Sequence, residues 1–286
     1  MKINHIVCPI DFSETSLKAL RFAAQIAHKN SAHIHLIHAF DKPYYSVASG
    51  AGTISYAVDA EAATELRTGI SKEFDIVAGM PELKGLTVYK KLIGDVQPWK
   101  FYEEMDAAKM DLIVMGTRGA TGILHGGLIG TNTERVIRSA PVPVVSVPDG
   151  FENHEIKRIL FATDFSEDVS PALSHVIDFA ALFGAEVTVG MINTRDTFST
   201  TRYANDSFNA LCAKFPQANL KLVVHNYLTI EEGIWELCQM YAMNLIAMMT
   251  HGRTGISHLI KGSIAEELAS TSFITLPLLT LKLQQS

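Results

Sequence analysis

The segment HIVCPIDFSETSLKALRFAAQIA, residues His5 to Ala27, is interpreted as a strand, a turn and a helix in that order. It opens with a short apolar run rich in β-branched residues, which is typical of a buried strand. The motif DFSE, beginning at Asp11, ends the run and leads into a helical candidate from Glu14 to His28. Ser13 is predicted to cap that helix, and an acidic residue in the first turn suits the helix dipole.

The same arrangement returns in RILFATDFSEDVSPALSHVIDFA, which begins at Arg158, so the DFSE motif at Asp11 matches a second one at Asp164. A later pair also matches: DLIVMGTRGATGI begins at Asp111 and NLIAMMTHGRTGI begins at Asn244. The chain is therefore predicted to be a tandem duplication, shortened in its second copy between the two landmarks. Turn-forming residues gather in VPDGFENHE, 147–155, which predicts domains at 1–149 and 154–286.

Each copy shows five short segments that favour strands, separated by helical candidates. In the first copy, the expected strands are 3–10, 32–40, 83–92, 111–116 and 142–147, and the expected helices are 14–28, 54–77, 96–109 and 131–139. In the second copy, the expected strands are 158–163, 186–192, 220–226, 244–249 and 273–281, and the second helix lies within 203–215.

Alternating strands and helices of this length predict parallel strands with helices on both faces. The predicted fold is α/β, with two tandem Rossmann-like (flavodoxin-like) domains, each a five-stranded, mainly parallel sheet. Apolar edge strands need covering, so the final strands of the two copies are expected to pack together and make an intramolecular pseudo-dimer. Association of two chains into a homodimer stays open.

Composition narrows the functional classes. The chain has 286 residues, a hydrophobic fraction of 48%, a charged fraction of 19% and a formal charge of −6. No apolar run approaches the roughly 18 residues of a membrane span, and the amino terminus has no signal-peptide core, so no membrane contact is expected. Three cysteines without a CxxC motif favour a reducing cytoplasm. The negative charge disfavours a nucleic-acid partner.

The segment VMGTRGATGILHGGLIGTNTERV, 114–136, holds six glycines after the fourth expected strand. Its helix entry at Thr131, like that at Ser263, contains the [ST]-x-x-E capping box. A cap leaves the preceding glycines unexplained, whereas close backbone approach to a phosphate at a helix N-terminus explains more of them. The segment is not a Walker A motif, because Lys is missing before Thr131, and it is not the dinucleotide motif that follows a first strand.

Ligands of open α/β sheets bind outside the carboxyl ends of the strands, at the point where the strand order reverses. Asp11 follows the first strand and the glycine segment follows the fourth, so both motifs meet in one crevice if those strands are neighbours. A helix cap does not obviously need the Asp11 carboxylate, which makes this residue a ligand candidate.

The repeated PIDFS-type motif and the glycine segment together resemble the universal stress protein family, in its two-domain form, over nearly the whole chain. That family binds ATP through the pattern G-x2-G-x9-G followed by Ser or Thr. The first copy matches it with Gly116, Gly119, Gly130 and Thr131, although ten residues separate Gly119 from Gly130. The second copy keeps the nine-residue gap, but Met249 stands where the first glycine belongs.

The resemblance implies contacts to adenine, ribose and phosphates in the first copy and a degenerate site in the second. The implied nucleotide-binding residues are Pro9, Asp11, Ala39, Met115, Gly116, Arg118, Gly119, Gly130, Thr131 and Asn132. The implied residues of the degenerate second site are Asp164, Gly252, Gly262 and Ser263.

Other sites are less well supported. His33, His35 and His38 share one expected strand, and without nearby acid or Cys ligands we interpret them as solvated or core residues rather than metal ligands. Arg118 and His251 occupy equivalent loop positions, where a phosphate contact and simple solvation are equally supported. No Ser/His/Asp order, HExxH or CxxC motif is present, so no catalytic residue is assigned.

The sequence therefore predicts a cytoplasmic stress-response protein that binds ATP, with or without Mg²⁺, or another adenine nucleotide, as a regulatory binding module. Two alternatives stay open. One is a slow ATP hydrolase, and the other is a protein-interaction scaffold whose nucleotide sites are vestigial.

Overall fold

The computed structural model describes residues 2–40, 44–49, 52–57, 60–94, 96–106, 109–117, 131–152, 155–250, 268 and 275–282. The first half contains β1 (His5–Pro9), α1 (Glu14–Asn30), β2 (His33–Phe40), β3 (Tyr44–Ser49), β4 (Gly52–Ala57), α2 (Ala60–Ala78), the 3₁₀ helix η1 (Pro81–Leu83), β5 (Val88–Gly94), the 3₁₀ helix η2 (Pro98–Glu104), β6 (Leu112–Gly116), α3 (Thr131–Ser139) and β7 (Val144–Val147). The second half contains β8 (Arg158–Ala162), α4 (Ser170–Phe183), β9 (Glu186–Asn193), α5 (Thr201–Lys214), β10 (Leu220–Asn226), α6 (Ile230–Met240), β11 (Leu245–Thr250) and β12 (Leu278–Lys282).

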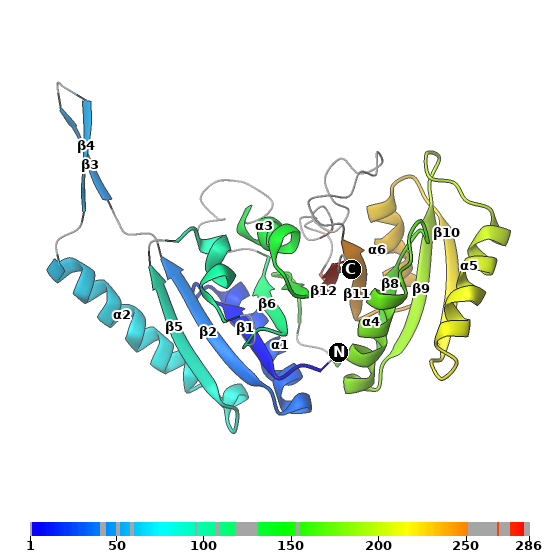
Figure 1. Cartoon of the computed structure of the whole chain (residues 1–286), viewed down its shortest axis with the longest axis horizontal. Coiled ribbons are helices and arrows are strands. Elements are labelled where there is room, and N and C mark those ends of the chain that lie inside the picture. Colours follow the sequence, from blue (N-terminus) through cyan, green and yellow to red (C-terminus); the bar gives the residue numbers. More distant parts are fainter. Residues whose placement is uncertain are drawn as a thin grey trace.

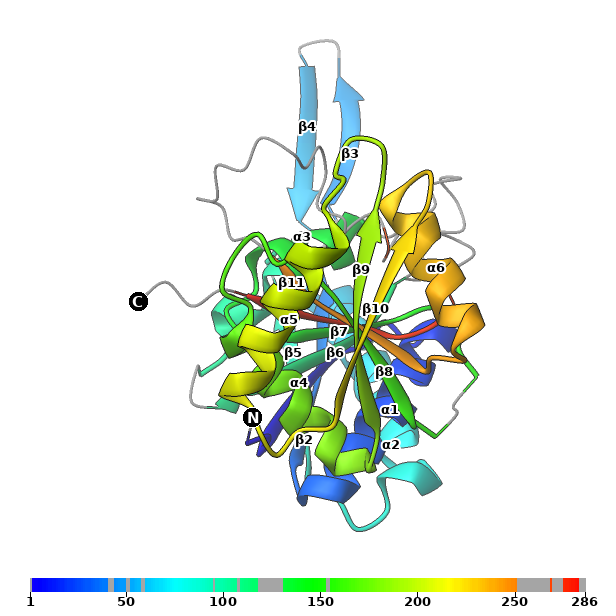
Figure 2. The same ribbon diagram turned by 90° about the vertical axis from the view of Figure 1, so that its right-hand side faces the viewer.

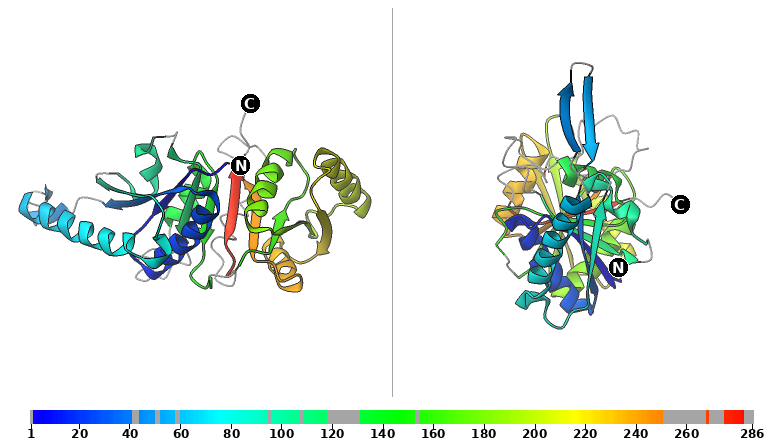
Figure 3. Two further views of the ribbon diagram at one scale, coloured as in Figure 1. Left: turned by 90° about the horizontal axis from the view of Figure 1, so that it is seen from below. Right: turned by 90° about the vertical axis from the view of Figure 1, so that its left-hand side faces the viewer.

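Both halves build the same five-stranded parallel sheet, and the two sheets join into one. The strand order is β10-β9-β8-β11-β12-β7-β6-β1-β2-β5, so the order in which strands are added to the sheet reverses between the parallel neighbours β1 and β6 and again between β8 and β11. The expected contact between the final strands is present: β7 and β12 pair antiparallel, with Val145 opposite Leu279. Figure 1 and the left panel of Figure 3 show β12 at the centre, between the halves.

Helices cover both faces of the sheet, as alternating strands and helices predict. One core cluster packs α1, α2, α4 and α5 against one face, through residues such as Phe22, Phe74, Phe179 and Leu211. The opposite face carries η2, α3 and α6, through residues that include Phe101, Ile137 and Leu237. Figure 2 shows α4 and α5 on one side of the second-half strands and α6 on the other.

Two helix predictions in the first half were wrong in part. The expected helix 54–77 begins only at Ala60, because residues up to Ala57 belong to the antiparallel hairpin of β3 and β4. This hairpin stands away from the sheet in Figure 1 and in the right panel of Figure 3. In the sequence, Gly50 and Gly52 lie between two runs of β-formers, and this was the overlooked signal.

The expected helix 96–109 is only the short 3₁₀ helix η2. Its whole sequence is PWKFYEE, and aromatic residues of this kind are poor helix formers. Phe101 and Tyr102 are buried against the sheet, so tertiary packing rather than helix propensity holds the segment. Among the described residues, no helix has the length and apolar character needed to cross a membrane.

Candidate functional site

Neighbouring strands bring the two sequence motifs of the first half to one edge of the sheet. β1 and β6 pair in parallel, with Val7 opposite Ile113, so the turn after β1 and the end of β6 lie side by side. The second half repeats this geometry through β8 and β11. Each half therefore has a switch point of the kind at which α/β proteins bind ligands.

The turn after β1 is held by the Asp11 side chain. Asp11 Oδ1 accepts hydrogen bonds from the backbone N–H of Ser13, at 3.1 Å, and from the Ser13 hydroxyl, at 2.5 Å. Between them, Phe12 adopts a left-handed backbone with φ of 62°, which is rare for a bulky residue. One role of this carboxylate is thus to stabilise a strained turn, and such strain is concentrated at functional sites in proteins.

The second half keeps the same turn. Asp164 Oδ1 accepts from the Ser166 backbone N–H at 2.9 Å and from its hydroxyl at 2.7 Å, and Phe165 has φ of 57°. Here a further contact is present, because the Tyr203 hydroxyl of α5 donates to the Phe165 carbonyl at 2.9 Å. The turn of the second half is therefore bridged to the helix that follows β9.

The predicted capping role of Ser13 is confirmed. Its hydroxyl accepts from the Ser16 backbone N–H at 3.2 Å, and α1 begins at the next residue, Glu14. The matching Ser166 does not cap a helix, because α4 begins only at Ser170 after the N-cap position Val169. Pro171 occupies the first turn of α4, where the missing N–H costs nothing.

Gly116 has a packing reason that the sequence did not reveal. A Cβ at this position would lie 2.9 Å from Thr15 Cγ2 and 3.1 Å from the Thr15 carbonyl carbon and oxygen. The first turn of α1 therefore presses directly on the end of β6. The sequence pattern assigns this glycine to the approach of a phosphate, but the described contacts show that the approach of a helix already requires it.

Thr133 links the end of β6 to the first turn of α3. Its hydroxyl donates to the Gly116 carbonyl at 2.9 Å, and the side chain is only 2% exposed. Thr117, the residue after Gly116, donates its backbone N–H to the Val147 carbonyl, so the end of β6 is also bonded to the end of β7. The sequence analysis did not predict a role for Thr133. The signal was a difference between the copies: two residues after the helix entry, the first copy has Thr133 and the second has Ala265.

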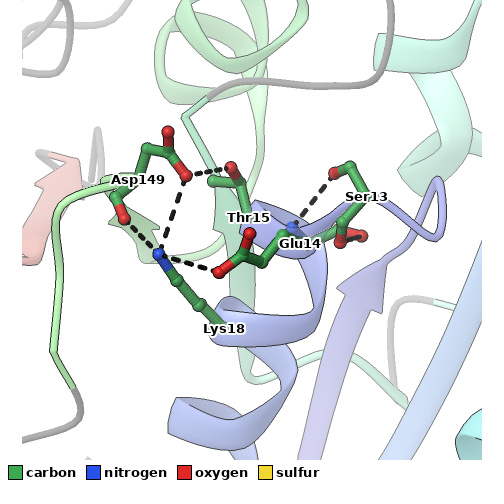
Figure 4. A network of polar contacts seen from close by, with 6 residues as sticks. Ser13, Glu14, Thr15, Lys18 and Asp149 are labelled. Atoms are coloured by element: carbon green, nitrogen blue, oxygen red, sulfur yellow. Dashed lines mark hydrogen bonds and ion pairs between the residues drawn. The ribbon is translucent and has the colours of Figure 1, made fainter.

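Asp149, which follows β7 in the segment leading to the second half, is bonded to α1 beside this site (Figure 4). The Asp149 carboxylate accepts from the Thr15 hydroxyl at 2.8 Å, and Lys18 Nζ donates to the Asp149 carbonyl at 2.5 Å. Lys18 also lies 3.8 Å from the Asp149 carboxylate and 3.5 Å from that of Glu14. The first turn of α1 is therefore in contact with both β6 and the residues that follow β7.

The remaining predicted residues fall into three groups. Ala39 and Met115 pack against the core on the face of η2 and α3, whereas Gly116 faces α1. Pro9 ends β1, and α3 begins with Thr131 and Asn132. Six predicted residues lie outside the described part of the chain: Arg118, Gly119, Gly130, Gly252, Gly262 and Ser263.

Two histidines of β2, His35 and His38, make contacts at opposite ends of the strand. His38 Nδ1 is 2.7 Å from the Ile10 carbonyl, and its ring lies 5.0 Å from that of Phe12, beside the Asp11 turn. His35 Nε2 is instead 3.1 Å from His5 Nδ1 at the other end of the strand. Burial, with help from His5 and His33, lowers the pKa of His35 to about 4. The described residues contain no group of three potential ligands placed to hold a metal ion.

The fold and this site define a class: tandem α/β domains whose switch points each carry an aspartate turn, with α3 following the glycine-containing sequence after β6 in the first half. The sequence pattern of the universal stress protein family matches residues 2–148, and the chain belongs to that family.

Individual relatives agree with membership of this family. Universal stress protein MJ0531 of Methanocaldococcus jannaschii is 33% identical over 148 residues, which are 50% of this chain and 80% of that protein. Universal stress protein Slr1230 of Synechocystis is 32% identical over 176 residues, 60% of this chain, and the match spans only 58% of that protein. A universal stress protein of Mycolicibacterium smegmatis is 24% identical and covers 93% of this chain and 94% of its own length, which accords with a tandem member.

A solved structure agrees over the whole fold. The crystal structure of a universal stress protein from Archaeoglobus fulgidus covers 99% of both chains with a TM-score of 0.73 at 20% sequence identity. The arrangement of two flavodoxin-like halves is thus shared with a known structure.

Proposed function

We propose that the first half of this chain binds ATP or another adenine nucleotide and that the protein acts as a regulatory binding module. The observation that carries the proposal is the convergence of the Asp11 turn and the N-terminus of α3 on neighbouring strands, with Thr133 bonded to Gly116 between them. A helix N-terminus beside a strand end presents backbone N–H groups to an anion. The described residues therefore fit the phosphate end of a nucleotide.

We assign the parts of the nucleotide to residues of the first site according to the family pattern. The residues of the first site, in the order of the chain, are Pro9, Asp11, Ala39, Met115, Gly116, Arg118, Gly119, Gly130, Thr131 and Asn132. We assign the phosphates to the N-terminus of α3 and the glycine segment before it, and the nucleoside to the ends of β1 and β2. Mg²⁺, when present, would accompany the phosphates.

We propose that the second half binds nucleotide more weakly, through Asp164, Gly252, Gly262 and Ser263. The Tyr203 hydroxyl already engages the carbonyl of the turn in this half. We further propose that residues 1–149 and 154–286 are the two domains, joined as an intramolecular pseudo-dimer by β7 and β12. All three cysteines are free thiols, which supports a cytoplasmic location.

Two experiments test the proposal. Denaturing freshly purified protein and identifying any released nucleotide by mass spectrometry separates a binding module, which releases ATP, from a hydrolase, which releases ADP. The second compares Asp11→Asn with Asp11→Ala by calorimetric titration with ATP. Asn keeps the oxygen that accepts from Ser13, so it preserves the turn while removing the charge. If the carboxylate binds ligand, both variants lose affinity; full affinity in Asp11→Asn would show that Asp11 serves only the turn.

A further inference from the structure

The Asp11 turn is held by the side chain of His38, near the end of β2. His38 Nδ1 donates to the Ile10 carbonyl at 2.7 Å, because a carbonyl oxygen can only accept a hydrogen bond. The His38 ring also lies 5.0 Å from the ring of Phe12, with an angle of 30° between the two planes. One side chain therefore contacts the residue directly before Asp11 and the residue directly after it.

A second aromatic contact fixes the ring of Phe12. Phe74 of α2 meets that ring edge-on, with 5.6 Å between the ring centres and 78° between the planes. Phe74 is itself buried in the core. A left-handed backbone at a bulky residue, with φ of 62° at Phe12, persists only where the surroundings hold it in place. His38 and Phe74 are such surroundings.

His38 lies on the face of the sheet away from the predicted nucleotide contacts of β2 and β6. Ala39 and Met115 pack against the core on the face of η2 and α3, whereas Phe12 and Phe74 belong to the core of the opposite face. Successive side chains of a strand point to opposite faces, so His38 and Ala39 are separated in this way. His38 is thus placed to act on a ligand through the turn and not by contact with the ligand.

The second half holds its turn with different residues. Met191 directly follows Gly190, the last residue of β9 that pairs with β8, just as His38 follows the last residue of β2 that pairs with β1. Met191 is buried, and its side chain has no hydrogen to donate. The Phe165 backbone N–H instead donates to the Thr163 hydroxyl at 3.0 Å. The histidine support is therefore a feature of the first half.

We propose that His38 is a positioning residue of the nucleotide site, which holds the Asp11 turn in the orientation that meets the nucleoside. This inference rests on the function proposed above, in which the ends of β1 and β2 bind the nucleoside. By fixing the residues on both sides of Asp11, His38 sets the direction of the carboxylate before the ligand arrives. A site that is already ordered binds at lower cost, so the affinity of the first half depends on this histidine.

The test uses three variants of the full chain. His38→Met gives the first half the residue of the second half. His38→Asn is the conservative variant, because its side-chain amide keeps an N–H donor close to the position of Nδ1. Met191→Leu is the matched control, a volume-conserving change at the same position of the second half.

Two quantities are measured for each variant. Calorimetric titration with ATP gives the affinity of the site. Amide hydrogen exchange, followed by NMR, reports the opening of each turn at Ser13 and at Ser166, whose backbone N–H groups donate to the two aspartates. The two serines allow the two turns to be compared within one molecule.

We expect His38→Met to weaken ATP binding about two- to tenfold and to speed exchange at Ser13 by a similar factor, because one neutral hydrogen bond is lost. Exchange at Ser166 should stay unchanged in this variant. His38→Asn should recover ATP affinity at least in part, and Met191→Leu should bind ATP as the parent chain does.

Three outcomes would overturn the inference. If the parent chain binds ATP and His38→Met binds it equally well, the inference fails while the proposed function stands. Equal acceleration of exchange at Ser13 and Ser166 would assign His38 to the general stability of the fold. Absence of ATP binding by the parent chain would overturn the proposed function, and this inference with it.

Discussion

The two halves share their first turn but differ in where the following helix begins. Asp11 and Asp164 each accept a hydrogen bond from the hydroxyl of the serine two residues later. In both halves the phenylalanine between the aspartate and the serine has a left-handed backbone conformation. In the first half the helix starts at once, at Glu14; in the second it starts only at Ser170. The turn is thus the constant part of the repeat, and the first turn of the helix is the variable part.

This difference explains the residue at the end of the fourth strand of each half. Where the helix starts early, Thr15 lies against β6 and leaves no room for a side chain at Gly116. Where it starts late, Met249 fits, and it packs against the core cluster that contains Val169 and Ala172. The loss of a glycine in the second copy is therefore coupled to the loss of a helical turn, whatever its effect on a ligand.

The largest expected effect comes from giving the first half the residue of the second. Gly116→Met forces a side chain against the backbone of Thr15, and overpacking of this kind costs about 1–3 kcal/mol. Urea unfolding measures the loss. Gly69→Met is the control, because a Cβ at Gly69 meets nothing within 4 Å. Equal stability of Gly116→Met and the parent chain would mean that α1 does not press on β6 as described.

A smaller effect separates the two serines that follow the aspartates. Ser13→Ala should cost about 1 kcal/mol, because it removes a helix cap. Ser166→Ala removes the same hydrogen bond to the aspartate but no cap, so it should cost clearly less. The two variants are compared in one urea series. If their losses are equal, the capping difference between α1 and α4 is not a source of stability.

A third effect concerns pH and the histidines at the start of β1 and β2. The pKa of His35 in the folded protein is about 4, against an ordinary value of 6.5. The unfolded chain therefore binds a proton that the folded protein does not, and stability falls as pH drops from about 6.5 to about 4. His5, His33, Lys109 and Tyr89 surround the ring, whereas the second half has Thr188 at the matching register position. His35→Gln should flatten the stability profile over that window, and an unchanged slope would assign the pH dependence to other groups.

Much of the architecture was predictable because it depends on local patterns. The five strands of each half and the entry into α1 are visible in β-branched runs and in the cap at Ser13. The hairpin of β3 and β4 was missed because the expected helix was begun at Ile54, inside the run of β-formers that follows Gly52. η2 was missed because its aromatic residues are held by burial, which a helix pattern does not show.

The candidate site was predictable only in part. The adjacency of the Asp11 turn and Gly116 follows from the switch-point rule once the strand order is known. The contact of Gly116 with Thr15, the bond from Thr133 and the link from Asp149 join residues that are far apart in sequence. No periodicity encodes such contacts, because they depend on how helices and loops approach the strand ends.

The most direct test of the central claim is the stoichiometry of ATP binding to the full chain, measured by calorimetry with Mg²⁺ present. The claim is that the first half carries the nucleotide site and that the second half, with its turn bridged by Tyr203, binds more weakly. We predict one high-affinity site per chain, lost in Asp11→Asn and retained in Asp164→Asn. Two sites of equal affinity, or a single site that depends on Asp164 instead, would contradict the account.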